Sequence, residues 1–219
     1  MTEPSGGSDS KPKRPVVVPA VALVAVTAVG ITALLGGLNE RPEPAPPQLK
    51  AGQTLDQGQF DTQFVESKIT LQPAEDEFSK DKRFLDVIFK VTNKTDATVS
   101  VGGLRWGKSK GYGFGGTLLK MTPEIKAEYG YDLFVLSKGV QSSQLQPGIP
   151  ATVIARYELL GSTEPPKQVS YNVGAYERLV NGLTDQASWF LESEPGLLDE
   201  EDQDKVVATI TLPVKPQEA

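Results

Sequence analysis

The chain has 219 residues, with 22 lysines and arginines against 28 aspartates and glutamates, which gives a formal net charge of −6. It contains no cysteine and no histidine. These absences exclude disulfide bonds, serine-histidine and cysteine-histidine catalysis, and metal sites built from histidine or cysteine. The negative charge also argues against nucleic acid as a partner, because DNA and RNA require a basic surface. We therefore expect a protein that is not an enzyme and needs no cofactor.

An apolar run near the N-terminus predicts a membrane anchor. Residues 16–38 read VVVPAVALVAVTAVGITALLGGL and contain no charged side chain. A membrane-spanning helix needs about 20 apolar residues, so residues 15–38 are predicted to form a single transmembrane helix. Residues 1–14 are polar and are predicted to be a disordered cytoplasmic tail. Basic residues next to a membrane span favour the cytoplasmic side. The lysines and the arginine just before the run therefore predict that the N-terminus lies inside the cell and the remaining chain outside it.

A cleaved signal peptide is the alternative to this anchor. Its apolar region is normally 7–15 residues long and ends at small residues of the A-x-A type. The run here is longer and continues as LLGGLNERPEP without such a site, so an uncleaved signal anchor is favoured. Residues 39–50, NERPEPAPPQLK, are predicted to be a proline-rich, extended linker.

From residue 51 onward the apolar residues alternate as in β-strands. In residues 60–64 the apolar side chains fall at even-numbered positions, and in residues 65–71 they fall at odd-numbered positions. This shift of the alternation by one residue predicts a β-bulge between the two segments. FLDVIFKVTN, residues 84–93, is the clearest strand, and a polar turn at residues 93–96 predicts a hairpin with residues 97–104. TPEIKAEY, residues 122–129, begins with an N-cap and a proline and predicts one short helix. Further strands are predicted at residues 117–120, 131–137, 151–160, 169–176, 188–191 and 205–212.

This series of short strands predicts the fold class. Many strands separated by turns, with little helix, are typical of an antiparallel β-sandwich. We therefore expect a mainly β protein, in which an immunoglobulin-like antiparallel β-sandwich at residues 51–213 follows the transmembrane helix. Residues 214–219 are predicted to be a tail.

Three segments resemble a known family. They read AGQTLDQGQFDTQFVESKI, FLDVIFKVTNKTDATVSV and SSQLQPGIPATVIARYEL. They resemble the immunoglobulin-like extracellular domains of Gram-positive secreted and lipid-anchored proteins, which are related to a secreted immunogenic antigen of mycobacteria. The resemblance implies the sandwich fold and a location outside the cytoplasm, and it brings no catalytic residue with it. Many members carry a lipid-anchoring cysteine, which this chain lacks.

The glycine-rich segment RWGKSKGYGFGG, residues 105–116, is the main candidate for a binding surface. Aromatic and basic side chains between glycines can stack on sugars or hold an anionic polymer. The alternative is a glycine-rich hairpin whose aromatic residues fold into the edge of the sandwich. The candidate binding residues are Arg105, Trp106, Lys108, Lys110, Tyr112 and Phe114.

Three other features have a weaker claim to function. The acidic run at residues 199–204 could supply oxygen ligands to Ca²⁺, but its spacing fits a solvated loop better. Glu124 and Glu128 would share one face of the predicted helix, as a pair of glycosidase carboxylates would need, although nothing in the sequence places them in a cleft. Trp106 and Trp189 are interpreted mainly as core anchors.

Together these observations favour a non-catalytic interaction module that is held at the membrane by its single span. Its expected partner is another envelope protein, for example in a complex where this chain is an accessory subunit. The alternatives are a domain that binds a cell-wall polymer or a small ligand through residues 105–116, and a hydrolase that uses carboxylates alone.

Overall fold

The computed structural model describes residues 44–74, 76–127, 130–161, 163–182, 184–194 and 203–216. The chain divides into two units, residues 1–45 and 46–219, and the fold described here is that of the second. The predicted cytoplasmic tail, transmembrane helix and most of the predicted linker lie outside the described residues. Within the ranges given above, no helix is long and apolar enough to cross a membrane.

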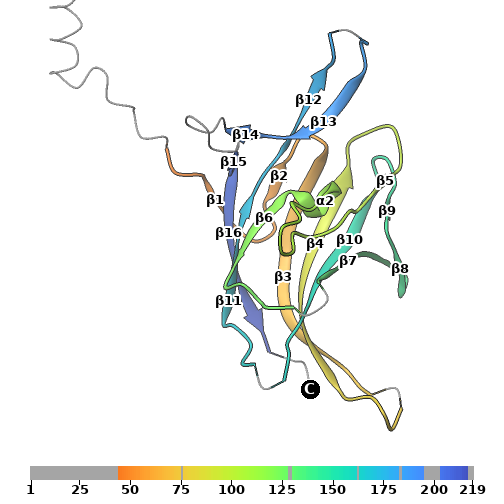
Figure 1. Cartoon of the computed structure of the whole chain (residues 1–219), viewed down its shortest axis with the longest axis vertical. Coiled ribbons are helices and arrows are strands. Elements are labelled where there is room, and N and C mark those ends of the chain that lie inside the picture. The colour runs from red at the N-terminus through yellow and green to blue at the C-terminus, as the bar shows by residue number, and fades with distance from the viewer. Residues whose placement is uncertain are drawn as a thin grey trace, which may run out of the picture. The chain divides into compact units, whose positions relative to one another are not determined.

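Strands form nearly all of the regular structure (Figure 1). In the described residues the one helix is the single turn α2 (Gly113–Gly116). The strands are β1 (Gln48–Leu49), β2 (Thr54–Asp56), β3 (Phe60–Gln72), β4 (Lys82–Asn93), β5 (Val99–Ser100), β6 (Leu118–Thr122), β7 (Asp132–Ser137), β8 (Val140–Ser142), β9 (Gln144–Leu145), β10 (Pro150–Glu158), β11 (Gln168–Val173), β12 (Tyr176–Val180), β13 (Ala187–Leu191), β14 (Ser193–Glu194), β15 (Gln203–Asp204) and β16 (Ala208–Lys215).

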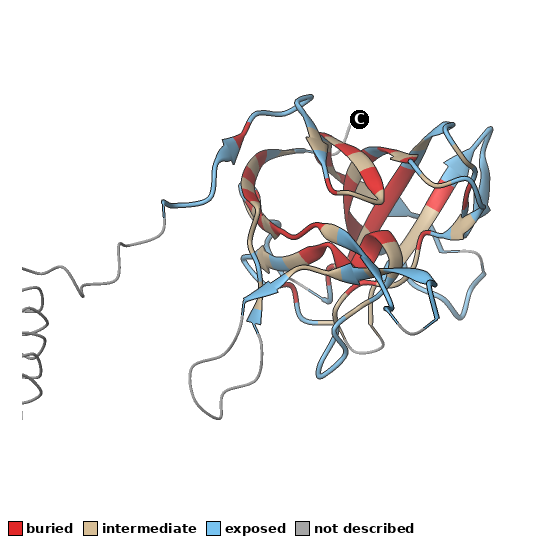
Figure 2. Ribbon diagram, turned by 90° about the horizontal axis from the view of Figure 1, so that it is seen from above, coloured by how far each residue is buried: buried red, intermediate tan, exposed pale blue. Residues whose placement is uncertain are grey.

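The main sheet is curled upon itself and resembles a β-sandwich. Its strands follow the order β6-β11-β16-β3-β4-β10-β7-β8, while β1 pairs with β16 and β2 with β3. Tyr171 of β11 packs across the interior against Phe64 of β3 and Phe89 of β4, at ring-centroid distances of 6.0 and 6.2 Å. Buried residues lie on strands of both halves (Figure 2), and they form one hydrophobic cluster. The mainly β, sandwich-like architecture predicted from the sequence is thus confirmed.

The sheet is mixed and not purely antiparallel as predicted. β16 runs parallel to β3 and to β1, whereas the other pairs are antiparallel. The parallel pairing with β3 is limited to the end of β16, where Val214 lies opposite Ser67 and Lys215 opposite Lys68. At this junction the hydroxyl of Ser67 donates to the carbonyl oxygen of Pro213 at 3.0 Å. The final strand therefore closes one half of the curled sheet onto the other.

The predicted bulge in β3 is confirmed. The register of β3 against β4 shifts between Phe64 and Glu66. Phe60 and Phe64 are buried before the shift, Ile69 is buried after it, and Val65 is exposed. One extra residue at a bulge moves the following side chains to the opposite face of the strand. The change of phase in the sequence therefore keeps the apolar residues of β3 directed to the core along its whole length.

The predicted hairpin between residues 84–93 and 97–104 is wrong. β4 pairs with β3 and β10, whereas β5 pairs with β9. The side-chain amide of Asn93 is buried and donates to the carbonyl oxygens of Ala97 and Leu145, at 2.7 and 3.1 Å. These bonds direct the chain after Asn93 toward β9, so it does not fold back on β4.

The predicted helix at residues 122–129 is also wrong in its described part. Residues 123–127 form neither helix nor strand. Ile125 is buried in the core, and its carbonyl oxygen accepts a hydrogen bond of 2.6 Å from the hydroxyl of Tyr131. Local helix propensity is a weak preference that tertiary contacts override. Burial of Ile125 and the bond to Tyr131 hold this segment in an irregular conformation.

Candidate functional site

Residues 103–112 form a small hairpin-like loop outside the main sheet. Gly103 and Tyr112 exchange two backbone hydrogen bonds of 3.1 Å, and the amide of Ser109 donates to the carbonyl oxygen of Trp106 at 3.0 Å. The tip of the loop therefore lies between Trp106 and Ser109. We call residues 103–112 the glycine loop.

Two glycines allow the loop to fold this tightly. Gly102 has a φ of +87°, and a Cβ atom there would lie 1.8 Å from the carbonyl oxygen of Tyr112. A Cβ atom on Gly115 would lie 2.5 Å from the carbonyl oxygen of Gly103. Both distances are far shorter than any van der Waals contact, so the close approach of backbone to backbone requires glycine at these positions.

Phe114 holds the base of the glycine loop in the core. Its ring is fully buried and packs edge-on against Phe89 and Phe60, with centroids 5.4 and 6.0 Å apart. Phe114 therefore has no surface for a ligand, and its assignment as a candidate binding residue is corrected. The alternative interpretation, in which aromatic residues of this segment fold into the sandwich, holds for Phe114 because α2 turns its side chain inward.

Arg105 also holds the base of the glycine loop, through polar contacts. Its Nη1 lies 2.7 Å from Oδ2 of Asp204, and its Nη2 donates to the carbonyl oxygen of Gly116 at 3.3 Å. Both side chains are about four-fifths buried, with 21% and 20% of their surface exposed. Since Asp204 is the last residue of the predicted acidic run, the ion pair joins two segments that lie far apart in the sequence.

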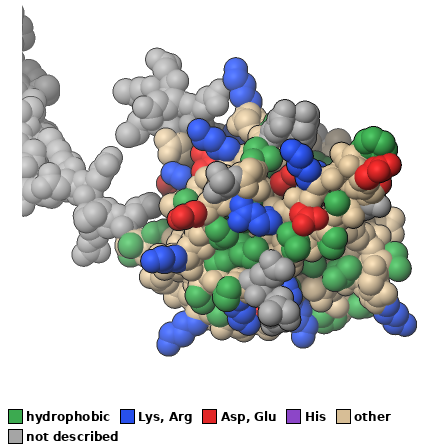
Figure 3. Space-filling model, turned by 90° about the horizontal axis from the view of Figure 1, so that it is seen from below, with side chains coloured by type: hydrophobic (Ala, Val, Ile, Leu, Met, Phe, Trp, Pro, Cys, Tyr) green, Lys and Arg blue, Asp and Glu red, His purple; other side chains and the backbone are tan. Residues whose placement is uncertain are grey.

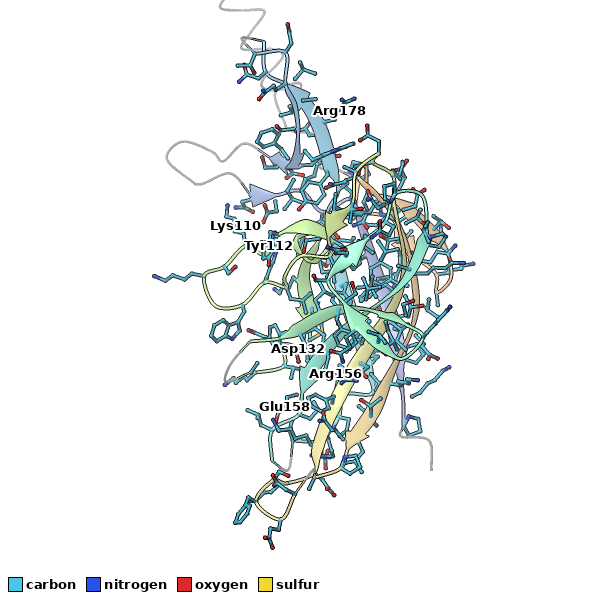
Figure 4. All side chains as sticks on the ribbon, turned by 90° about the vertical axis from the view of Figure 1, so that its right-hand side faces the viewer. Lys110, Tyr112, Asp132, Arg156, Glu158 and Arg178 are labelled. Atoms are coloured by element: carbon cyan, nitrogen blue, oxygen red, sulfur yellow. The ribbon has the colours of Figure 1, made fainter. Side chains whose placement is uncertain are left out.

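The remaining four candidate residues are exposed on the loop. Trp106 exposes 46% of its surface and Tyr112 exposes 64%. Lys108 and Lys110 are also exposed. Figure 4 shows Lys110 and Tyr112 together at one edge of the molecule. The interpretation of Trp106 as a core anchor is therefore wrong, because the loop carries it outside the sandwich. Two aromatic rings and two lysines are displayed on a backbone that is fixed at its base.

A pocket of about 220 Å³ lies between the glycine loop and β6. Arg105 and Trp106 line it from the loop, and Lys120 and Met121 line it from β6. Its aromatic lining is formed by Tyr131, Tyr157 and Tyr171. We call it the tyrosine pocket.

The three tyrosines are connected to one another. The rings of Tyr131 and Tyr157 lie 4.8 Å apart between centroids, and the hydroxyl of Tyr171 donates to that of Tyr157 at 2.9 Å. Burial raises the pKa of Tyr157 and of Tyr171 well above the usual tyrosine value. Both hydroxyls therefore keep their protons at neutral pH, and the tyrosine pocket offers neutral hydrogen-bonding groups beside apolar rings.

Comparisons with known proteins give little guidance about this site. No family model matches the chain, and no curated protein matches it in sequence. A similar solved structure is an uncharacterized β-sandwich protein from Clostridium difficile 630, which is 9% identical. The match covers 60% of this chain and 91% of that one, with a TM-score of 0.37. The likeness concerns architecture alone and identifies no functional residue.

The other candidates from the sequence do not assemble into a site. Residues 199–202 of the acidic run and Glu128 lie outside the described residues, and Glu124 is exposed at the rim of the tyrosine pocket. In the part of the chain that the structure describes, no three Asp or Glu residues gather as metal ligands would. Trp189 is partly buried on β13.

A second, larger hollow of about 580 Å³ is mainly apolar. It is lined by Pro123, Ile125, Leu159, Leu160 and Pro166, with Glu124, Lys126 and Glu164 among its other residues. Viewed from below the molecule, hydrophobic side chains gather in patches between separate acidic and basic residues (Figure 3). This hollow offers apolar contact but lacks the buried hydroxyls of the tyrosine pocket, so it has less capacity to select a ligand.

Proposed function

We propose that this chain is a non-catalytic binding module, anchored in the membrane by residues 15–38 and displayed outside the cell. Its sandwich would then be an immunoglobulin-like domain of the Gram-positive type that the sequence resembles. The glycine loop is the contact surface, and its ligand is a polymer of the cell wall. The observation that carries this proposal is the exposure of Trp106 and Tyr112 on a loop whose base is fixed by Phe114 and Arg105.

The geometry of the loop supports binding in two ways. Aromatic faces provide large contact areas with few rotatable bonds, so little conformational entropy is lost on binding. Lys108 and Lys110 lie between the two rings in the sequence and supply positive charge for the anionic groups of a polymer. Because the base of the loop is already ordered by hydrogen bonds and core packing, a ligand would not have to order it.

Cosedimentation with purified cell walls tests this function. The full chain in mild detergent is mixed with wall fragments, and the bound fraction is compared with that of the Trp106→Ala/Tyr112→Ala double variant. We expect the double variant to lose most of the bound fraction with an unchanged melting temperature. Phe78→Ala is the matched control, because Phe78 exposes 90% of its surface on the β3–β4 turn, outside the loop. Equal binding by the double variant and wild type would contradict the proposal.

A protein partner is the second candidate, favoured by the arm formed by β12 and β13. These strands pair only with each other among the described residues and project beyond the main sheet (Figure 1). Leu179, Val180 and Phe190 are exposed on this arm. Exposed apolar side chains on a projecting element are typical of protein-binding surfaces.

Crosslinking in native membranes, followed by mild detergent purification and mass spectrometry, tests the second candidate. A stoichiometric partner that is lost on Leu179→Asp/Phe190→Asp would make the chain an accessory subunit. Recovery of the wild-type chain alone would count against this candidate and would leave the wall polymer as the ligand.

A further inference from the structure

The tyrosine pocket contains a hydroxyl hydrogen that no described residue accepts. In the bond between the two buried tyrosines, Tyr171 is the donor and Tyr157 the acceptor. The hydroxyl of Tyr157 has one hydrogen of its own, and no acceptor for it is found within the described ranges. Since Tyr157 is almost fully buried and lines the pocket, a ligand oxygen that enters the pocket can accept this hydrogen.

Arg105, which also lines the pocket, contains a second donor without an acceptor. Its Nη1 and Nη2 are used by Asp204 and Gly116, but its Nε is buried and has no acceptor among the described residues. Buried polar groups are nearly always hydrogen-bonded in folded proteins, and the exceptions call for an explanation. The Nε atom of Arg105 has almost no accessible surface, so an oxygen in the pocket does not reach it, and the donor that the pocket offers to a ligand is the hydroxyl of Tyr157.

The charges around the pocket favour a neutral acceptor. The guanidinium of Arg105 is already paired with the carboxylate of Asp204. Lys120 and Glu124, also lining residues, carry opposite charges. With its positive charges balanced in this way, the pocket gives little net attraction to a second anion. A carbonyl oxygen accepts the hydroxyl hydrogen of Tyr157 without adding charge.

The size and lining of the pocket restrict the ligand further. A volume of about 220 Å³ is below the roughly 300–1,000 Å³ of pockets that enclose whole drug-sized ligands. The pocket can therefore take one substituent of a larger molecule. Leu104, Leu118 and Met121 contribute apolar surface beside the tyrosine rings, which suits a methyl group next to the carbonyl. Trp106 at the entrance offers a flat face to the ring that carries the substituent.

We propose that the tyrosine pocket binds the N-acyl group of an amino sugar, with the acyl oxygen accepting from the hydroxyl of Tyr157 and the sugar ring stacked on Trp106. This inference rests on the proposed function, because it specifies which part of a wall polymer the glycine loop selects. Nothing but binding is involved, and no bond is made or broken.

Titration with short oligosaccharides tests the inference. The full chain in mild detergent carries Trp189→Phe, so that Trp106 is the remaining tryptophan and its fluorescence reports on the entrance of the pocket. The probe is the trimer of β-1,4-linked N-acetylglucosamine, and the matched control is cellotriose, which has the same linkage and a hydroxyl in place of each acetamido group. We expect saturable quenching by the first and at least tenfold weaker binding of the second.

One substitution tests the donor. Tyr157→Phe keeps the ring and removes the hydroxyl. It is expected to weaken binding of the acetylated trimer by about 3- to 10-fold, as for the loss of one hydrogen bond. Tyr171→Phe is expected to weaken it less, because Tyr157 still has its own hydrogen to donate. Phe78→Ala, outside the loop and the pocket, should bind as wild type does.

The outcomes separate this inference from the proposed function. If the acetylated trimer does not bind, or if cellotriose binds equally well, the pocket does not recognise an acyl group and the inference is overturned. The same holds if Tyr157→Phe binds as wild type does while remaining folded by circular dichroism. In each case a loss of wall cosedimentation on Trp106→Ala/Tyr112→Ala would still support the proposed function, so the two can fail independently.

Discussion

Arg105 and Asp204 form an ion pair of 2.7 Å between Nη1 and Oδ2, although they lie about 100 residues apart in the sequence. Arg105 begins the segment that displays Trp106 and Tyr112, and Asp204 ends the acidic run that precedes β16. The pair therefore fastens the glycine loop to the C-terminal part of the domain. The carboxylate of Asp204 also neutralises the charge of Arg105 beside the tyrosine pocket.

Asp204→Asn should destabilise the domain and weaken wall binding. The substitution leaves the partly buried guanidinium of Arg105 without its charged partner, which costs about 1–3 kcal/mol in the free energy of unfolding. Urea denaturation of the full chain measures this loss. Glu158→Gln is the control, because its pair with Lys82 is longer, at 3.4 Å, and more exposed. That control should cost less than about 1 kcal/mol. Equal costs for the two variants would show that the Arg105 pair has no special role.

Phe114→Ala should be among the most destabilising changes in the candidate segment. It removes a fully buried ring from the aromatic cluster with Phe60 and Phe89, which typically costs about 3–5 kcal/mol. The melting temperature and the urea midpoint both report the change. Phe78→Ala, which truncates a ring in solvent, should alter the free energy of unfolding by less than about 0.5 kcal/mol. A small effect of Phe114→Ala would contradict the placement of this ring in the core.

The buried pair of Asp86 and Arg156 predicts a non-additive pair of substitutions. Nε and Nη2 of Arg156 donate to the two carboxylate oxygens of Asp86 at 2.8 and 2.7 Å, and the guanidinium lies between the rings of Phe84 and Phe134. Asp86 is only 2% exposed. Removing one partner leaves a buried charge and should cost about 3–5 kcal/mol, whereas replacing both by leucine should cost less.

A double-mutant cycle with Asp86→Leu, Arg156→Leu and the double variant measures this coupling by urea denaturation. Additive effects, in which the double variant loses the sum of the two single losses, would show that the pair is not a unit.

Acid should weaken the junction of β3 and β16. The ammonium of Lys215 lies 2.5 Å from Glu66 and holds the pKa of that carboxyl below its usual 4.5. Because the pKa is lower in the folded state, the contribution of this pair is fully present above pH 4.5 and is lost as the pH falls through the folded value. Glu66→Gln should therefore lower stability at neutral pH and reduce the loss of stability in acid.

Denaturation of wild type and Glu66→Gln across this acidic range gives the comparison. Glu177→Gln, on the exposed part of β12, is the control for the loss of one carboxylate. Parallel curves for wild type and Glu66→Gln would contradict a role for the pair in acid sensitivity. The pKa of Asp56 is also lowered, by its hydrogen bond to Lys94, and this exposed pair contributes with the same sign in both proteins.

Most strands could be predicted because their signal is local. The alternation in residues 84–93 and 151–160 arises from side chains that point to opposite faces, and β4 and β10 are found there. The bulge in β3 was predictable for the same reason, since it shifts the alternation by one residue. The pairing of β5 with β9 was not predictable, because it depends on bonds from Asn93 to a residue far along the chain.

The candidate site could be predicted only in part. Glycines, aromatic residues and lysines mark the loop in the sequence, and Tyr112 is exposed as the binding interpretation of that pattern required. Trp106 is exposed too, although the sequence favoured a core position for it. The sequence did not show that Phe114 points inward, because burial depends on the turn of α2. The tyrosine pocket was missed altogether, since Tyr131, Tyr157 and Tyr171 come from separate segments of the chain. The one sign of the pocket in the sequence was that Tyr157 in β10 and Tyr171 in β11 each fall at a core-facing position of the alternation.

In-cell photocrosslinking from the tip of the glycine loop shows what the loop contacts in living cells. A photoreactive benzoylphenylalanine is placed at position 108 of the full-length chain, or at position 78 as the control, and living cells are irradiated. If the loop binds a wall polymer, we expect a heterogeneous, slowly migrating adduct at position 108 that collapses after digestion with wall-degrading enzymes and is absent at position 78. No adduct at position 108, or a discrete adduct with one protein that survives this digestion, would contradict the claim that the loop binds a wall polymer.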